Sequence, residues 1–110
     1  MRLPNPAHAV VDLQKLLSYC LNPAHPRGGS KARVFAAALD VTIQDTGLLR
    51  QKLLDAAHSL EATLGKKDGY GQRYVIDFPM DGPNGKATVR SCWIVRANED
   101  FPRLTSCYVL

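Results

Sequence analysis

The chain has 110 residues, of which 45% are hydrophobic and 22% charged, and its formal net charge is +4. This length and composition are typical of one globular domain, 1–110, with a single core, and the length excludes a second core. No apolar run approaches the ~18 residues that a membrane span requires, and the segment 1–6 lacks the apolar region of a secretory signal. We therefore expect a cytoplasmic protein without membrane insertion.

Cysteine and histidine spacing argues against a metal site. The three cysteines cannot all pair within one chain and include no C-x-x-C motif, which favours reduced, half-buried thiols. His8, His25 and His58 are far apart and have no metal-ligand spacing with Cys or carboxylates. We expect neither a metal nor a cofactor.

Three helices are predicted between about residues 12 and 59. The expected spans are 12–20, 30–39 and 42–59. Each begins at a residue type that caps helices, namely Asp12, Ser30 and Thr42, the last in a capping-box sequence closed by Asp45.

One face of each helix is expected to be buried. The positions at helical spacing are Leu13, Leu16, Leu17 and Cys20; Val34, Phe35, Ala38 and Leu39; and Leu48, Leu49, Lys52, Leu53, Ala56 and Leu60. Lys31 lies one turn before Val34 and Phe35. It should therefore face the sheet, whereas Arg33 should point elsewhere.

From residue 61 onward the apolar period changes from helical to alternating. Strands are expected over about 61–66, 72–80, 86–97 and 103–110. The Asn84–Gly85 pair is a signal for a tight hairpin turn. Helices first and hairpin-linked strands afterwards predict an α+β fold, with N-terminal helices packed on an antiparallel sheet of about four strands over 61–110.

Alternation divides the side chains of the sheet between two faces. Trp93 and Tyr108 are assigned to the face that packs on the helices. The other face is expected to carry a set of polar side chains: Arg73, Asp77, Arg90, Arg96, Arg103 and Thr105. These arginines either bind phosphate, for which guanidinium is suited, or pair with Asp77, Glu99 or Asp100 on a solvated face.

A second cationic element precedes the second helix. Residues 21–35 carry His25, Arg27, Lys31 and Arg33 and no acid, and a helix start favours anions. The chain lacks the motifs of Walker loops, serine hydrolases and zinc proteases. These residues instead match the needs of metal-free RNA cleavage, which are a base, an acid and cations for the phosphorane charge.

Candidate roles follow from that chemistry. His25 or Lys31 is the acid or base, Arg90 and Arg73 stabilise charge, and Thr105 or Tyr108 is a positioning hydroxyl. The expected catalytic residues are His25, Lys31, Arg90 and Thr105, and the expected nucleic-acid contacts are Arg27, Arg73, Arg96 and Arg103. A purely structural role stays open for each residue taken singly.

Several short blocks in order carry a family resemblance. They are Asn22-Pro23, His25-Pro26-Arg27-Gly28, Lys31-Ala32-Arg33-Val34-Phe35, Tyr70-Gly71-Gln72-Arg73-Tyr74-Val75, Gly82-Pro83-Asn84-Gly85, Val89-Arg90-Ser91, Trp93-Ile94, Glu99-Asp100-Phe101-Pro102-Arg103-Leu104 and Cys107-Tyr108-Val109-Leu110. From Leu3 to Leu110 the chain resembles the bacterial domain of unknown function 6883. Asp40 departs from the family pattern, which has Gly after the helix.

The resemblance implies a toxin module, because such domains occur alone or at the C-terminal tips of large secreted or phage-related proteins. The order of elements is also similar to that of the barnase, colicin and RelE group of metal-independent ribonucleases. Together, these resemblances imply an endoribonuclease-type toxin acting on RNA, with a small antitoxin or immunity protein as partner. The alternative is a non-catalytic protein- or nucleic-acid-binding module of a toxin–antitoxin or phage-related system.

Overall fold

The computed structural model describes residues 1–83 and 85–110, so the predicted turn at Asn84 involves a residue outside the described ones. The helical elements are η1 Pro6–His8, α1 Leu13–Lys15, η2 Leu16–Cys20, α2 Gly29–Leu39, η3 Ile43–Asp45 and α3 Thr46–Ser59. The strands are β1 Thr63–Asp68, β2 Gly71–Gly82, β3 Gly85–Arg96 and β4 Pro102–Val109.

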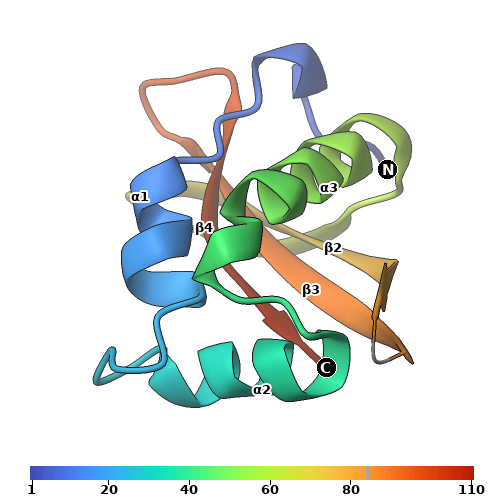
Figure 1. The fold of residues 1–110 in the computed structure, drawn as a ribbon. Helices are drawn as coiled ribbons and strands as arrows, with labels where there is room; N and C mark the ends of the chain where they lie inside the picture. Colours follow the sequence, from blue (N-terminus) through green and yellow to red (C-terminus); the bar gives the residue numbers. More distant parts are fainter. Residues whose placement is uncertain (84) are drawn as a thin grey trace.

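The four strands form one antiparallel sheet in the order β1-β2-β3-β4, and the helices gather on one of its faces (Figure 1). The predicted α+β fold is therefore confirmed. We call the opposite side the open face. It carries alternate residues of each strand, including Arg73, Val75 and Asp77 of β2 and Arg90, Cys92 and Ile94 of β3.

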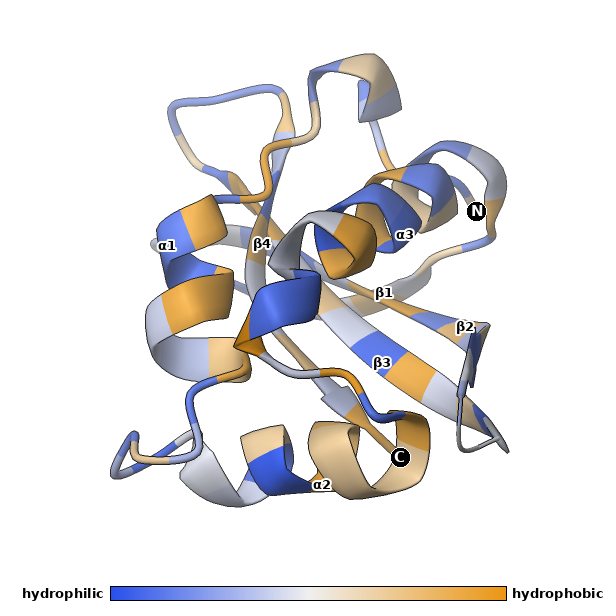
Figure 2. Cartoon of the chain, viewed as in Figure 1, coloured by the Kyte–Doolittle hydropathy of each residue, from blue (hydrophilic) through white to orange (hydrophobic). Residues whose placement is uncertain are grey.

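The core lies between the helices and the sheet. In the middle of β3, buried residues (Val89, Ser91 and Trp93) alternate with half-buried ones, as expected for a strand with one buried face, and Figure 2 shows both hydrophobic and hydrophilic residues along this strand. The side chains with no exposed surface include Leu16, Phe35, Leu39, Leu49, Leu53, Ile76, Val89 and Trp93. The interpretation of Trp93 as a core residue is thus confirmed.

A buried polar pair lies inside this core. The Trp93 Nε1–H donates to Ser91 Oγ at 2.9 Å, and the Ser91 hydroxyl donates to the Ile76 carbonyl at 2.8 Å. Both side chains are fully buried, so each polar group needs the partner that it has here.

The helices bury narrower stripes than their sequence pattern indicates. Five positions of the predicted buried faces are instead exposed: Leu13 at 47%, Leu17 at 38%, Val34 at 45%, Leu48 at 50%, and Lys52. A short helix that packs on one flat sheet buries only the positions facing it, so the edges of a wide apolar stripe remain in solvent.

The predicted capping box of Thr42 and Asp45 is confirmed. The Thr42 backbone N–H donates to the Asp45 carboxylate at 2.9 Å, and the Thr42 side chain accepts a bond from the backbone of the first helical turn.

Strand β4 departs from simple alternation at Thr105. Trp93 is opposite Leu104, but Cys92 is opposite Ser106, so the strand holds one extra residue at this bulge. A one-residue shift turns every later side chain to the other face. Cys107 is consequently buried, and Tyr108 lies on the open face beside Arg90, which corrects the assignment of Tyr108 to the core face.

Candidate functional site

The centre of the open face is an Arg–Asp pair that joins two long strands. Arg90 of β3 is directly opposite Asp77 of β2. The Arg90 Nε and Nη2 groups donate to the two carboxylate oxygens of Asp77 at 2.8 and 2.9 Å. These bonds hold the pKa of Asp77 below its usual range and raise that of Arg90. Both groups therefore stay charged at neutral pH, and the guanidinium is fixed in one orientation.

Tyr108 and Lys31 complete this cluster from the other side. Tyr108 is opposite Arg90 on β4, which is an edge strand of the sheet, so the tyrosine is accessible to a side chain from α2 at that edge. The Lys31 ammonium lies 4.3 Å from the centre of the Tyr108 ring, a cation–π distance. Lys31 thus faces the sheet as predicted, whereas Arg33 turns away and donates to the Pro23 carbonyl at 2.8 Å.

Cys92 lies in the same region of the open face. Burial raises the pKa of its thiol, although the charges of Arg90 and Lys31 act in the opposite direction. The thiol is therefore protonated at neutral pH and is a poor nucleophile. Arg90, Asp77, Tyr108, Lys31 and Cys92 are hereafter the Arg90 cluster.

The loop before α2 is organised by His25. Its Nδ1 accepts bonds from the backbone N–H groups of Arg27 and Gly28, each at 3.0 Å, and its carbonyl accepts from Gly29. The ring also packs edge-on against Tyr19, with centroids 4.8 Å apart. These N–H groups therefore already have partners within the loop. The sequence instead predicted that the N–H groups at this helix start bind an anion.

His25 also explains where α2 begins. The helix starts at Gly29 with Gly28 as its N-cap and no side-chain cap, so Ser30 is not the cap that the sequence predicted. The backbone bonds to His25 satisfy the preceding N–H groups in place of a serine hydroxyl.

The remaining predicted arginines are spread along the strands and mostly paired. Arg103 forms a two-bond pair with Glu99, at 2.8 Å for each bond. Arg96 lies 4.0 Å from Glu99, and Arg73 lies 3.8 Å from Asp68. Arg27 is exposed on the loop before α2. The structural alternative, pairing with acids, therefore describes Arg73, Arg96 and Arg103 as well as Arg90.

Thr105 has a backbone role at the bulge. Its hydroxyl donates to the Cys92 carbonyl at 3.1 Å, and its own carbonyl accepts from the Lys15 ammonium at 3.3 Å. The residue thus holds the register that exposes Tyr108.

Two further findings concern ligands and membranes. Over 1–83 and 85–110, no three His, Cys, Asp or Glu side chains gather in a metal-binding arrangement. Within the same ranges, no helix combines the length and apolar character needed to cross a bilayer.

A family model described as "Domain of unknown function (DUF6883)" matches residues 2–110. The chain belongs to the DUF6883 family. The resemblance indicated by the sequence blocks is thereby confirmed. No curated protein matches this DUF6883 chain.

A solved structure shares the fold of this DUF6883 chain. It is a chain from a "Contact-dependent growth inhibition toxin - immunity protein complex" of Klebsiella pneumoniae 342, with a TM-score of 0.70 and 17% identity. The match covers 94% of this chain and 95% of that one. At this identity the likeness shows a common fold and leaves activity to be argued from the site.

Three members of the Arg90 cluster do not follow correctly from the sequence of this DUF6883 chain. The sequence predicts Asp77 only as a pairing partner, predicts the cysteines only as half-buried thiols, and predicts Tyr108 on the core face. The apolar positions Leu104, Cys107 and Val109 carry the missing signal, because their spacing changes from three residues to two. Such a change of phase within a strand indicates a bulge.

Proposed function

We propose that this chain is a toxin domain that cleaves RNA without a metal ion, with the Arg90 cluster as its reaction centre. The observation that carries the proposal is that Lys31 and Arg90, which are distant in the sequence, both neighbour Tyr108. The Lys31 ammonium lies 4.3 Å from the Tyr108 ring centre, and Arg90 is opposite Tyr108 in the sheet. The common fold with a chain from a toxin–immunity complex supports the toxin role.

The reaction has a simple balance. The ribose 2′-oxygen forms a bond to phosphorus while the bond from phosphorus to the 5′-oxygen breaks, leaving a 2′,3′-cyclic phosphate and a 5′-hydroxyl. A base takes the proton of the 2′-hydroxyl, and an acid gives a proton to the departing 5′-oxygen. Fixed cations stabilise the charge that builds on the phosphorane oxygens.

The cluster supplies most of these roles. Arg90 binds the phosphate, Lys31 donates the proton to the leaving oxygen, and the Tyr108 hydroxyl positions a phosphate oxygen. Asp77 is the carboxylate beside Arg90 and accepts the 2′-hydroxyl proton, although its lowered pKa makes it a weak base. Thr105 keeps Tyr108 on the open face through its bond to Cys92.

His25 is proposed as a second proton donor. Because Nδ1 accepts two backbone bonds, the neutral ring carries its proton on Nε2. The four arginines Arg27, Arg73, Arg96 and Arg103 are proposed to contact the RNA backbone on both sides of the cleavage point. Arg73 and Arg96 exchange their acidic partners for phosphate, whereas Arg103 keeps its two bonds to Glu99 and uses its remaining nitrogen. An immunity protein is proposed to cover the open face.

The test is cleavage of RNA by the purified chain in the presence of EDTA. We expect cyclic-phosphate products, and a loss of roughly 100-fold or more in rate for Arg90→Ala and for Lys31→Ala, since each removes a charge stabiliser or proton donor. Lys52→Ala is the matched control, because Lys52 is an exposed lysine of α3, which covers the face of the sheet opposite to the open face (Figure 1).

Three results would contradict the proposal. RNA that stays intact at equimolar protein, products that require added metal, or variants with unchanged rates and intact folds would each do so. The alternative of a non-catalytic nucleic-acid-binding module predicts intact RNA and, for each variant, only a weaker affinity whose salt slope falls by about one.

A further inference from the structure

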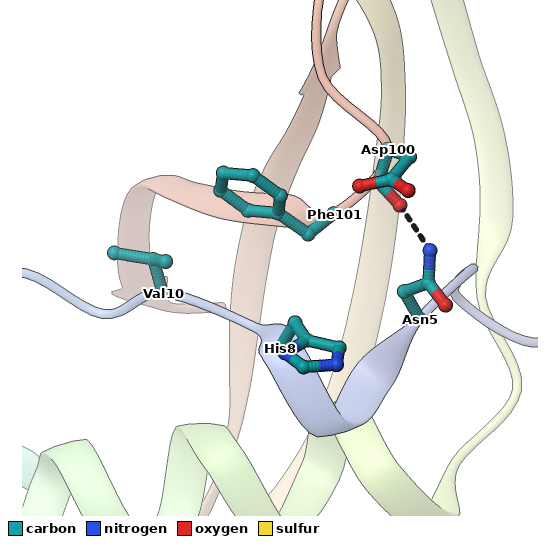
Figure 3. A pocket seen from close by; sticks show the side chains of 5 residues that line it. All are labelled: Asn5, His8, Val10, Asp100 and Phe101. Carbon is teal, nitrogen blue, oxygen red and sulfur yellow. Dashed lines mark hydrogen bonds between the residues drawn. The ribbon is translucent and has the colours of Figure 1, made fainter.

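A hollow in the surface lies away from the Arg90 cluster, between η1 and the loop that leads into β4. Its volume is about 390 Å³, within the range of small-molecule sites. The residues that line it are Asn5, His8, Val10, Asp100 and Phe101. Figure 3 shows the Phe101 ring, the His8 imidazole and the Asp100 side chain bordering the same space.

The walls of the hollow come from opposite ends of the chain and are tied together by hydrogen bonds. The Asn5 Nδ2 group donates to the Asp100 carbonyl at 2.6 Å. The Val10 N–H donates to the Pro102 carbonyl, and the Val10 carbonyl accepts from Leu104, both at 2.9 Å. The hollow is therefore held in shape before any ligand arrives, which favours binding.

Its side chains offer stacking and unused polar groups. The Arg103 guanidinium lies 4.9 Å from the Phe101 ring centre and is itself fixed by Glu99, so the ring is held in place. Among the described residues, the Asp100 carboxylate and the His8 imidazole take part in no hydrogen bond or ion pair. Aromatic rings bind bases by stacking, at roughly 1–3 kcal/mol per base.

We propose that this hollow binds a guanine base. The Asp100 carboxylate presents two acceptor oxygens side by side, and guanine alone among the four bases presents two adjacent donors, N1–H and N2–H. The His8 ring N–H is placed to donate to the acceptors on the same base, O6 or N7. Phe101 supplies the stacking surface.

The assignment of this guanine to an RNA rests on the proposed function. The distance between the hollow and the Arg90 cluster shows which part of the RNA the guanine would belong to. Val10 also lines a smaller hollow of about 120 Å³ with Arg103 and Thr105, which leads onto the open face. Arg103 is opposite Ile94 and Tyr108 is opposite Arg90, so the two lie four residues of β3 apart, roughly 13 Å along the strand. The guanine is therefore not on the nucleotide that is cut, and the hollow selects the RNA segment rather than driving the chemistry.

Binding of nucleoside monophosphates, followed by amide resonances in two-dimensional NMR spectra, tests the hollow. We expect GMP to shift the amides of Asn5, His8, Asp100 and Phe101, and AMP, CMP and UMP to leave them in place at the same concentration. Asp100→Asn should weaken GMP binding roughly tenfold or more, because one acceptor becomes a donor. Asp81→Asn, which alters an exposed acid paired to Lys86 on the β2–β3 hairpin, is the control.

A five-nucleotide 2′-O-methyl RNA with one guanosine distinguishes RNA from a free nucleotide as the source of the base. We expect it to bind roughly tenfold or more tightly than GMP and to shift the amides of Arg90 and Tyr108 as well. Equal affinity for the two probes, equal shifts for all four monophosphates, or unchanged GMP binding by Asp100→Asn would overturn the inference. Neither probe is cleaved, so intact RNA in the activity assay would contradict only the proposed reaction.

Discussion

The Arg90 guanidinium shows how one contact shapes the chemistry of the open face. Asp77 occupies Nε and Nη2 in the free chain, so a phosphate must either approach the remaining nitrogen or displace the carboxylate. An exposed ion pair of this kind contributes at most about 1 kcal/mol to the free energy of folding, so replacing Asp77 by a phosphate costs little free energy. The pair therefore orients Arg90 without blocking it.

His25 is the residue for which a structural and a catalytic role must be separated. His25→Ala removes the acceptor for two backbone N–H groups, and we expect a loss of about 1–2 kcal/mol in the free energy of unfolding. His25→Asn places an amide oxygen near the position of Nδ1 and should restore most of that stability. Urea unfolding measures both variants.

The two His25 variants also test the proposed proton donor. If His25 donates a proton in the reaction, His25→Asn stays impaired in RNA cleavage despite its restored stability. Full cleavage by His25→Asn would leave His25 with a purely structural role.

At the scale of elements, the end of α2 carries backbone strain at Asp40, the position where the sequence departs from the expected family pattern. Asp40 follows the helix with φ of 55°, in the left-handed region, and its N–H donates to the Ala36 carbonyl at 2.9 Å. Glycine adopts this conformation without steric penalty, which is the physical reason for a Gly after the helix. The departure at Asp40 therefore costs stability and changes no bond of the open face.

Replacing that residue gives a direct test. We expect Asp40→Gly to raise the free energy of unfolding by about 0.5–1 kcal/mol, because relief of the left-handed strain exceeds the added entropy of the unfolded chain. Thermal unfolding compares it with Gly47→Ala, which adds a helix-favouring methyl in open space within α3. A destabilised Asp40→Gly would mean that the Asp side chain, rather than the backbone, holds the helix end.

The positions of the helices and strands followed well from the sequence, but the phase of β4 after its bulge did not. The four strands and the three main helices lie close to their predicted ranges, because apolar periods and the caps Asp12 and Thr42 are local signals, although Ser30 does not cap α2. The phase of β4 after Thr105 did not follow, because a bulge depends on how the strand pairs with β3.

At the scale of the whole molecule, acidic partners balance much of the positive charge. The hydrogen bonds from Arg103 lower the pKa of Glu99, and those from Arg90 lower that of Asp77. A carboxyl whose pKa is lowered by folding stabilises the folded state above its unfolded value, about 4, and this contribution disappears as the pH falls through the folded pKa.

The expected outcome is a pH-dependent effect of Glu99→Gln. At pH 7 this variant should be less stable than the natural chain, and the difference should shrink below about pH 4 and vanish when Glu99 is protonated in both states. Urea unfolding at several pH values measures it. A difference that persists unchanged at pH 2.5 would assign the effect to packing rather than to charge.

By itself the sequence determined the class of fold, the family, the core tryptophan and the residues Lys31 and Arg90 as candidates, because local periodicity and residue chemistry suffice for these. Only the tertiary structure decided that Lys31 and Arg90 both neighbour Tyr108, and that His25 is bound to its own loop. Both depend on long-range pairing. A single bulge in β4 turns Tyr108 to the open face, and an edge strand lets a helix side chain reach it.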